Sequence, residues 1–247
     1  IDVNNSQLYV SSVIYPFVFS QLISCGFSII ITRYLADCLY EGEYDNVSGS
    51  CYGIIFMAQL AGAVAALLFY WDKPLPLHLK LITYTFFAEM IAMWLQMVYL
   101  TALKDYKSIF VSYFAGAAIS IVLTWLNLQY GFMAPVEGTM LSMCIGVGIL
   151  DLCFMVQIVR YFGYPSHAMN FEFLPYFEQH YKLFLLIIFY TLSIYVANFI
   201  VWNSSWGVMV AGTYLYSPRY DVITFYAFLS ILPIMIMFVV SMELKFY

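Results

Sequence analysis

Two acidic side chains fall in the middle of long apolar segments of this chain. Glu89 lies within "LITYTFFAEMIAMWLQMVYL", and Asp151 directly follows "CIGVGIL". An ionisable group at the centre of a bilayer costs on the order of 3 kcal/mol, so it normally faces a cavity or a polar partner. Gln96 follows Glu89 by seven residues, on nearly the same helical face, whereas Gln157 follows Asp151 by six and is offset by more than half a turn.

These groups predict a hydrated path that hydrogen-bonds a polar substrate or carries a proton, with Glu89, Gln96 and Asp151 as its best-supported members. The alternative is a pair of buried, protonated acids that bond to neighbouring helices. No Lys or Arg lies in the stretch 81–100 around Glu89 or in the segment 138–159 around Asp151, so either arrangement requires water or a retained proton. Asn198 is a further candidate, for which hydrogen bonding between helices is the more ordinary role.

Charged residues at helix ends are candidates for a cytoplasmic gate or a partner contact. Arg33 and Asp37 are four residues apart, so they would meet on one face of a helix that leaves the membrane. Lys104 and Asp105 follow another apolar segment and are candidates for the same role. A solvated helix end is the ordinary alternative.

Prolines inside two expected helices are hinge candidates. Pro16 lies in the first apolar segment and Pro233 in the last, and each removes one backbone hydrogen bond and bends its helix. Static bundles also contain such kinks, so passive packing is the alternative.

The remaining reactive side chains predict neither a cofactor nor a metal site. The five cysteines have no C-x-x-C spacing and the three histidines have no ligand spacing. The sequence has no G-x-x-x-x-G-K-[ST] loop, and its net charge of −5 includes no basic cluster that would suggest a nucleic-acid partner.

The elements that carry these residues are expected to be transmembrane helices. Of the 247 residues, 64% are hydrophobic and only 9% are charged, against roughly 25% charged in soluble domains. Continuous apolar runs of about 20 residues favour helices over barrel strands. We therefore predict an all-α, polytopic transmembrane bundle with apolar segments at about 8–32, 51–71, 79–103, 107–129, 138–159, 182–202 and 222–242.

The distribution of Lys and Arg predicts the orientation of the bundle. One set of connections carries six of the nine basic residues and the other set carries three, Lys73, Lys80 and Arg219. The first set is expected in the cytoplasm, which puts the start of the chain outside. An odd number of helices that starts outside, with no initial Met, leads us to expect a preceding helix that this chain lacks.

Three stretches resemble one known family. "YPFVFSQLISCGFSIIITRYLADCLYEGEYDNV", "YLTALKDYKSIF" and "YSPRYDVITFYAFLSILPIMIMFVVSMELKFY" are similar to segments of the Pel exopolysaccharide exporters (PelG), within the superfamily of drug and lipid-linked oligosaccharide exporters. The resemblance implies a twelve-helix fold of two lobes, of which this chain covers helices two to eight. Residues 1–160 would then form most of the N-terminal lobe, 161–181 a cytoplasmic linker, and 182–247 the start of the second lobe.

The resemblance also implies a function. Such a protein lies in the lipid bilayer of the inner membrane and exports an amino-sugar polymer across it. Its partners would be a cytosolic glycosyltransferase and membrane scaffold proteins. A cationic glycan would suit an acidic path. An exporter of drugs or lipid-linked oligosaccharides is the nearest alternative.

Two other classes of function remain open for this protein, an enzyme and a scaffold. An intramembrane glycan-modifying enzyme would need a general base, for which His167 is the only plausible residue. A scaffold that does not transport is a further possibility, although deep acids would then be costs without a purpose. We expect no covalent chemistry.

Overall fold

The computed structural model describes residues 3–103, 106–165, 169–224 and 226–227, and these are almost entirely helical. The long helices are α1 (Val3–Glu41), α2 (Val47–Tyr70), α3 (Leu77–Leu103), α4 (Tyr106–Tyr130), α5 (Pro135–Phe162) and α7 (Tyr181–Trp202). The short helix α6 (Leu174–Gln179) precedes α7, and the strands β1 (Val208–Val210) and β2 (Tyr214–Tyr216) follow it.

Each of the six long helices is long and apolar enough to cross a membrane. The shortest, α7, has 22 residues, which at 1.5 Å per residue spans about 33 Å, against a hydrocarbon core of about 30 Å. Because a helix satisfies its own backbone hydrogen bonds, these continuous apolar runs have no other stable conformation in lipid. The prediction of an all-α polytopic bundle is confirmed. The seventh expected segment, 222–242, lies almost entirely outside the described residues.

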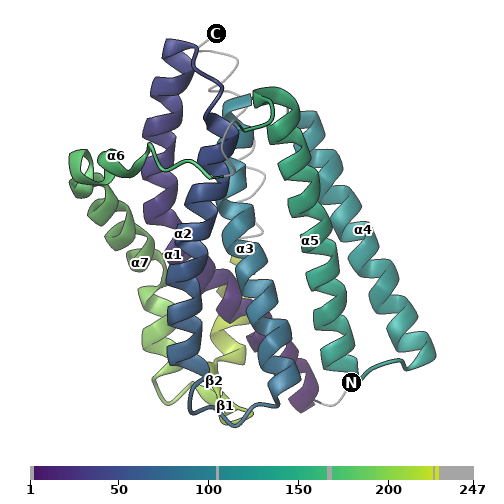
Figure 1. Cartoon of the computed structure of the whole chain (residues 1–247). Helices are drawn as coiled ribbons and strands as arrows, with labels where there is room; N and C mark the ends of the chain where they lie inside the picture. Colours follow the sequence, from purple (N-terminus) through teal and green to yellow (C-terminus); the bar gives the residue numbers. More distant parts are fainter. Residues whose placement is uncertain (1–2, 104–105, 166–168, 225, 228–247) are drawn as a thin grey trace.

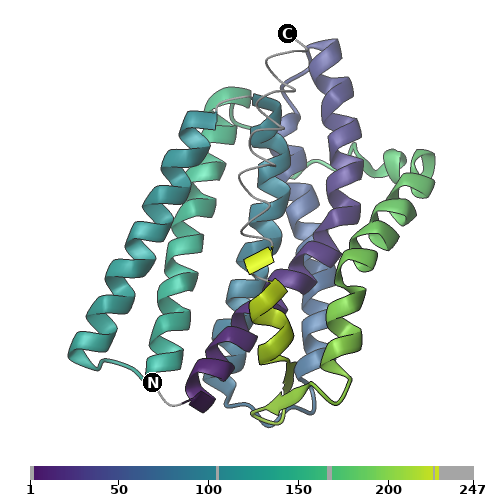
Figure 2. The ribbon, with the colours of Figure 1, turned by 180° about the vertical axis from the view of Figure 1, so that it is seen from behind.

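Helix α1 lies between the two sides of the bundle. In Figure 1, α4 and α5 form a pair on one side and α6 and α7 lie on the other. Figure 2 shows α1 crossing the back of the bundle and changing direction along its length. Helix α1 packs against both α3 and α7, so it connects α7 to the rest of the bundle.

The bundle has two ends that differ in structure. The "hairpin end" contains β1, β2 and the connection between α2 and α3, and the "α6 end" contains α6 and the connection between α1 and α2 (Figure 1). Successive helices alternate in direction, so Arg33, Arg160 and Lys182 all lie toward the α6 end. That the α6 end faces the cytoplasm stays a prediction.

Glycines allow α4 and α5 to pack closely. A Cβ atom at Gly116 would lie 2.7 Å from the carbonyl oxygen of Gly146, and one at Gly146 would lie 2.6 Å from the carbonyl oxygen of Gly116. No side chain fits at either position, which is the close backbone approach that small residues permit between membrane helices.

The core of the bundle is formed by α1, α2, α3 and α5, and apolar faces are exposed on α2, α4 and α7. Tyr99, Phe154, Ile54 and Ile91 are fully buried in this core. In contrast, Thr191 and Trp202 are the buried residues of α7. Exposed apolar side chains on a spanning helix face lipid, so this pattern is that of a multi-pass membrane protein.

The hairpin was not expected from the sequence. Strands β1 and β2 pair antiparallel, with Met209 opposite Leu215, and the turn between them contains Ala211 and Gly212 at φ of 49° and 62°. Positive φ at successive turn residues matches the twist of a tight hairpin. The hairpin residues lie in a connection between two apolar segments, and the apolar pattern of the sequence predicts only that the helices are interrupted there.

Candidate functional site

The deepest predicted acid, Glu89, lies on the face of α3 that packs against α5. A Cβ atom at Gly148 of α5 would lie 3.1 Å from Oε1 of Glu89, so the absence of a side chain there makes room for the carboxyl group. The other carboxyl oxygen, Oε2, is buried and has no hydrogen-bond partner. Glu89 is therefore a half-buried acid that points into a helix contact without a donor.

Asp151 lies one turn beyond Gly148 on α5 and interacts electrostatically with Glu89. Its Oδ1 atom is also buried and has no hydrogen-bond partner. The titratable groups that interact with the pair are the thiol of Cys144, beside Glu89, and the hydroxyl of Tyr113, beside Asp151. The structure thus brings the two predicted acids together across the contact between α3 and α5.

No cation compensates this acid pair within the described part of the chain. The ion pair that the structure contains there joins His78 and Glu137, at the hairpin end. Two carboxylates in one apolar site repel each other, and an isolated charge in hydrocarbon is costly. The pair therefore needs water, a proton or a bound cationic or hydroxyl group as its partner.

Gln96 extends the polar face of α3. The carbonyl of Ile82, seven residues before Glu89, accepts a hydrogen bond from the Cys144 thiol of α5 at 3.4 Å. Gln96 lies seven residues after Glu89, and so on the same helical stripe. It is 3% exposed and its Oε1 has no hydrogen-bond partner.

Gln157 belongs to a different contact, between α4 and α5. Its Nε2 donates to Ser112 Oγ at 2.7 Å and to the Ser108 carbonyl at 3.3 Å, both on α4. The offset from Asp151 that periodicity predicts is thus present in the structure. Gln157 does not join the acid pair.

Asn198 lies apart from these groups, on α7 near the hairpin end. Its Nδ2 is 3.5 Å from Oδ1 of Asp221, which is buried at 7% exposure. Asp221 also accepts from the indole N–H of Trp202, at 3.1 Å to each oxygen, and from the backbone N–H of Ser217 at 3.0 Å. Asp221 was not predicted from the sequence, although "SPRYD", with Ser before a proline at a helix start, is a recognisable N-terminal signal.

Arg33 and Asp37 do not meet as a pair, and their role as a gate or partner contact stays a prediction. Both side chains are exposed, and they form no ion pair. Oδ2 of Asp37 instead accepts a hydrogen bond from the hydroxyl of Tyr176, on α6, at 2.7 Å. This bond to Asp37, with partial burial, raises the pKa of Tyr176 to about 12.

Asp37 also lines a cavity of about 580 Å³ at the α6 end. The other acids that line it come from the end of α1, from the α1–α2 connection and from the segment before α6: Glu41, Glu43, Asp45 and Glu172. Arg33 does not line this cavity. Lys104 and Asp105, the other candidates for a gate or partner contact, lie outside the described residues.

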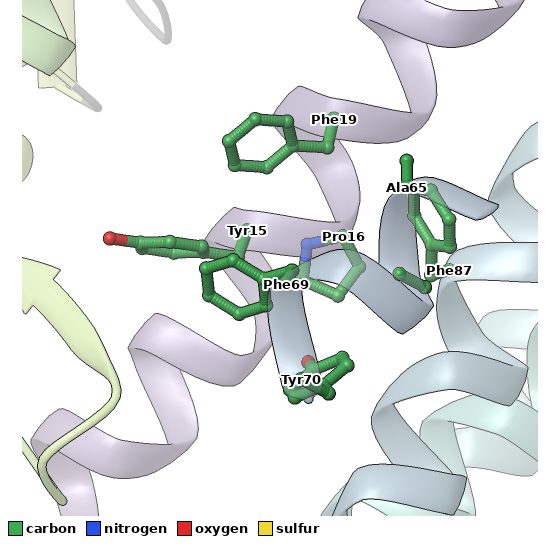
Figure 3. A pocket seen from close by; sticks show the side chains of 8 residues that line it. Tyr15, Pro16, Phe19, Ala65, Phe69, Tyr70 and Phe87 are labelled. Atoms are coloured by element: carbon green, nitrogen blue, oxygen red, sulfur yellow. The ribbon is translucent and has the colours of Figure 1, made fainter. Parts of the chain in front are cut away.

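Pro16 lies inside α1, a helix that changes direction along its length (Figure 2). It borders an apolar cavity of about 130 Å³ between α1, α2 and α3, together with Tyr15, Phe19, Ala65, Ala66, Phe69, Tyr70 and Phe87 (Figure 3). The second hinge candidate, Pro233, lies outside the described residues, as does His167.

One comparison with known proteins found a match. The family model PelG, described as "Putative exopolysaccharide Exporter (EPS-E)", matches residues 1–247. The comparison with curated proteins and the comparison with solved structures each found no match.

Proposed function

The chain belongs to the PelG family of exopolysaccharide exporters, and on this premise we propose that it exports a Pel-like amino-sugar polymer across the inner membrane. In this proposal it works beside a cytosolic glycosyltransferase and membrane scaffold proteins of the same synthesis and export system. The six apolar spans and the family together support a membrane-embedded route for the glycan.

The single observation that carries the proposed route is the acid pair. Glu89 and Asp151 lie together among membrane-spanning helices, and each keeps a buried oxygen without a donor. A buried acceptor left without a partner costs about 1–3 kcal/mol, which a purely structural acid would avoid by bonding to a neighbouring helix. Acceptors without donors suit a ligand rich in hydroxyl and amino groups.

The packing around the pair limits what can reach it. Because Gly148 is in contact distance of Glu89, no sugar ring fits between α3 and α5 as they stand. We propose that Glu89, Asp151 and Gln96 line the polar side of a hydrated path, where water or a proton occupies the closed contact. The amino and hydroxyl groups of the glycan meet this face when the helices separate.

The arrangement of the helices supports a division into two lobes. Helices α1 to α5 would form most of the N-terminal lobe, residues 161–181 the connection between lobes, and α7 the start of the second lobe. Helix α7 packs chiefly on α1 and buries little of its own surface, as expected of an element that moves against its neighbour. The glycan would pass by alternating exposure between the lobes.

The test is polymer export by cells that carry Glu89→Gln, Asp151→Asn or both, normalised to the amount of transporter in the membrane. We expect each single variant to lower export at least tenfold, because an amide cannot carry the charge or release the proton. The matched control is Glu137→Gln, since Glu137 is an acid of α5 that already has its partner in His78.

Export at the wild-type level in both single variants would exclude the acid pair from the route. Retained efflux of drugs or lipid-linked oligosaccharides in cells that make no polymer would instead favour the related exporters of the same superfamily.

A further inference from the structure

Tyr15 of α1 holds the hairpin through a single atom. Its hydroxyl donates to the carbonyl of Leu215 at 3.0 Å and accepts from the N–H of Leu215 at 2.8 Å. Both backbone groups of Leu215 therefore point away from β1 and toward α1. An unpaired strand edge requires partners for such groups, and here one side chain supplies both.

The ring of Tyr15 joins three further elements. It stacks on Trp202 of α7 with ring centres 5.0 Å apart and an angle of 8° between the planes. It also meets Tyr214 of β2 edge-on at 4.9 Å and Phe69 of α2 at 5.6 Å. The indole of Trp202 is itself held by Asp221. Tyr15 thus contacts α2, α7 and the hairpin at once, beside other contacts of α1 such as those of Phe19 with Phe69 and Phe199.

The next residue in α1, Pro16, is a point where the helix can bend. Proline has no N–H, so the carbonyl of Ser12 loses its intrahelical partner and the helix is weakened there. Figure 3 shows the ring of Tyr15 on one side of α1 and the cavity residues Ala65 and Phe87 on the other side of Pro16. The pocket of about 130 Å³ beside the proline kink is open to the surface at the exposed Ala65, and it leaves room for the bend to change.

We infer that Tyr15 and Pro16 form a latch and hinge that control opening of the bundle at its hairpin end. In the latched state, which this structure represents, the Tyr15 hydroxyl binds Leu215 and α1 packs on Trp202. In the unlatched state, α1 moves at Pro16 into the cavity and Tyr15 leaves Leu215, so that the hairpin separates from α1. The latch and hinge change the conformation of the bundle, and this change does not depend on which substrate is transported.

The test is hydrogen exchange of the segment 208–216 in the intact transporter, without substrate. Tyr15→Phe removes both hydrogen bonds and keeps the ring, and we expect exchange to rise on the order of tenfold, as for the loss of two neutral hydrogen bonds. Tyr113→Phe is the matched control for exchange of 208–216, because the hydroxyl of Tyr113 donates to the Met93 sulfur at 3.7 Å and makes no hydrogen bond to the hairpin.

A cavity-filling variant separates the hinge from a purely local loss of bonds. Ala66→Leu fills the space beside Pro16, and we expect it to slow exchange of 208–216 and to suppress the rise caused by Tyr15→Phe in the double variant. Ala61→Leu, the same change on the exposed face of α2, leaves exchange unchanged. An equal rise with and without Ala66→Leu would overturn the hinge, and no rise in Tyr15→Phe would overturn the latch.

If Tyr15→Phe does not fold, Ala66→Leu alone still tests the hinge. We expect this single variant to slow hydrogen exchange of 208–216, and unchanged exchange would overturn the hinge. Because exchange is measured without cargo, a failure of export by the acid variants leaves this result unaffected.

Discussion

Glu89 of α3 and Gly148 of α5 are in contact, and the carboxyl group of the first occupies the space that a side chain at the second would need. A Cβ atom at Gly148 would lie 3.1 Å from Oε1 of Glu89. The acid pair therefore depends on a glycine as much as on the two acids.

Gly148→Ala tests this dependence. The added methyl group would lie 3.1 Å from Oε1 of Glu89, so the carboxyl group must shift by a few tenths of an ångström. We expect polymer export to fall several-fold while the amount of transporter in the membrane changes little. Glu89→Asp, which shortens the side chain by one methylene, should restore part of the export when combined with Gly148→Ala. If Gly148→Ala exports at the wild-type level, the position of the Glu89 carboxyl group does not matter for export.

Asp221→Ala tests the buried carboxyl group at the hairpin end. The change leaves the Trp202 indole and the Ser217 N–H without their acceptor, and each unpaired donor costs about 1–3 kcal/mol. We expect a lower midpoint of thermal unfolding in detergent, with a smaller decrease for Asp221→Asn, which keeps one acceptor. Asp72→Ala, at an exposed acid of the same end, should have no effect. An unchanged midpoint in Asp221→Ala would mean that other groups satisfy these donors.

Titration of Tyr176 tests its contact with Asp37. The hydrogen bond raises the pKa of Tyr176 from 10.0 to about 12. The hydroxyl of Tyr176 loses its proton at a lower pH in the unfolded chain than in the folded one. The stability that the contact between α1 and α6 contributes is therefore fully present below pH 10 and is lost as the pH rises toward 12. The difference in tyrosinate absorbance between wild type and Tyr176→Phe should have its midpoint at about pH 12. In an Asp37→Asn background the midpoint should fall toward 10, and an unchanged midpoint would contradict the bond.

The helices could be predicted from the sequence because the apolar residues that define each helix lie within one continuous segment of the chain. The six continuous apolar runs became α1, α2, α3, α4, α5 and α7, and a helix is the only way for each run to satisfy its backbone in lipid. The offset between Asp151 and Gln157 followed from helical periodicity in the same way. Both predictions depend on spacing within a single element.

Arg33 and Asp37 form no ion pair, although they stand at helical spacing on one helix. Tyr176 approaches Asp37 from α6, an element 139 residues away in sequence that the apolar pattern did not predict. A charged pair at helical spacing forms only when no better partner comes from elsewhere in the fold.

The hairpin and its contact with Tyr15 could not be predicted from the sequence for a related reason. Residues Tyr15 and Leu215 are 200 positions apart, and a three-residue strand has no periodicity to detect. Only the fold brings a tyrosine of α1 to a strand edge that requires hydrogen-bond partners.

The sequence by itself determined that this protein spans a membrane many times and that Glu89 and Asp151 lie deep within its helices, because hydropathy and helical spacing are properties of local sequence. Only the tertiary structure decided that the two acids come within electrostatic range of each other across α3 and α5. The register between two helices is set by side-chain packing, here by the space at Gly148, and no spacing along one chain segment encodes it.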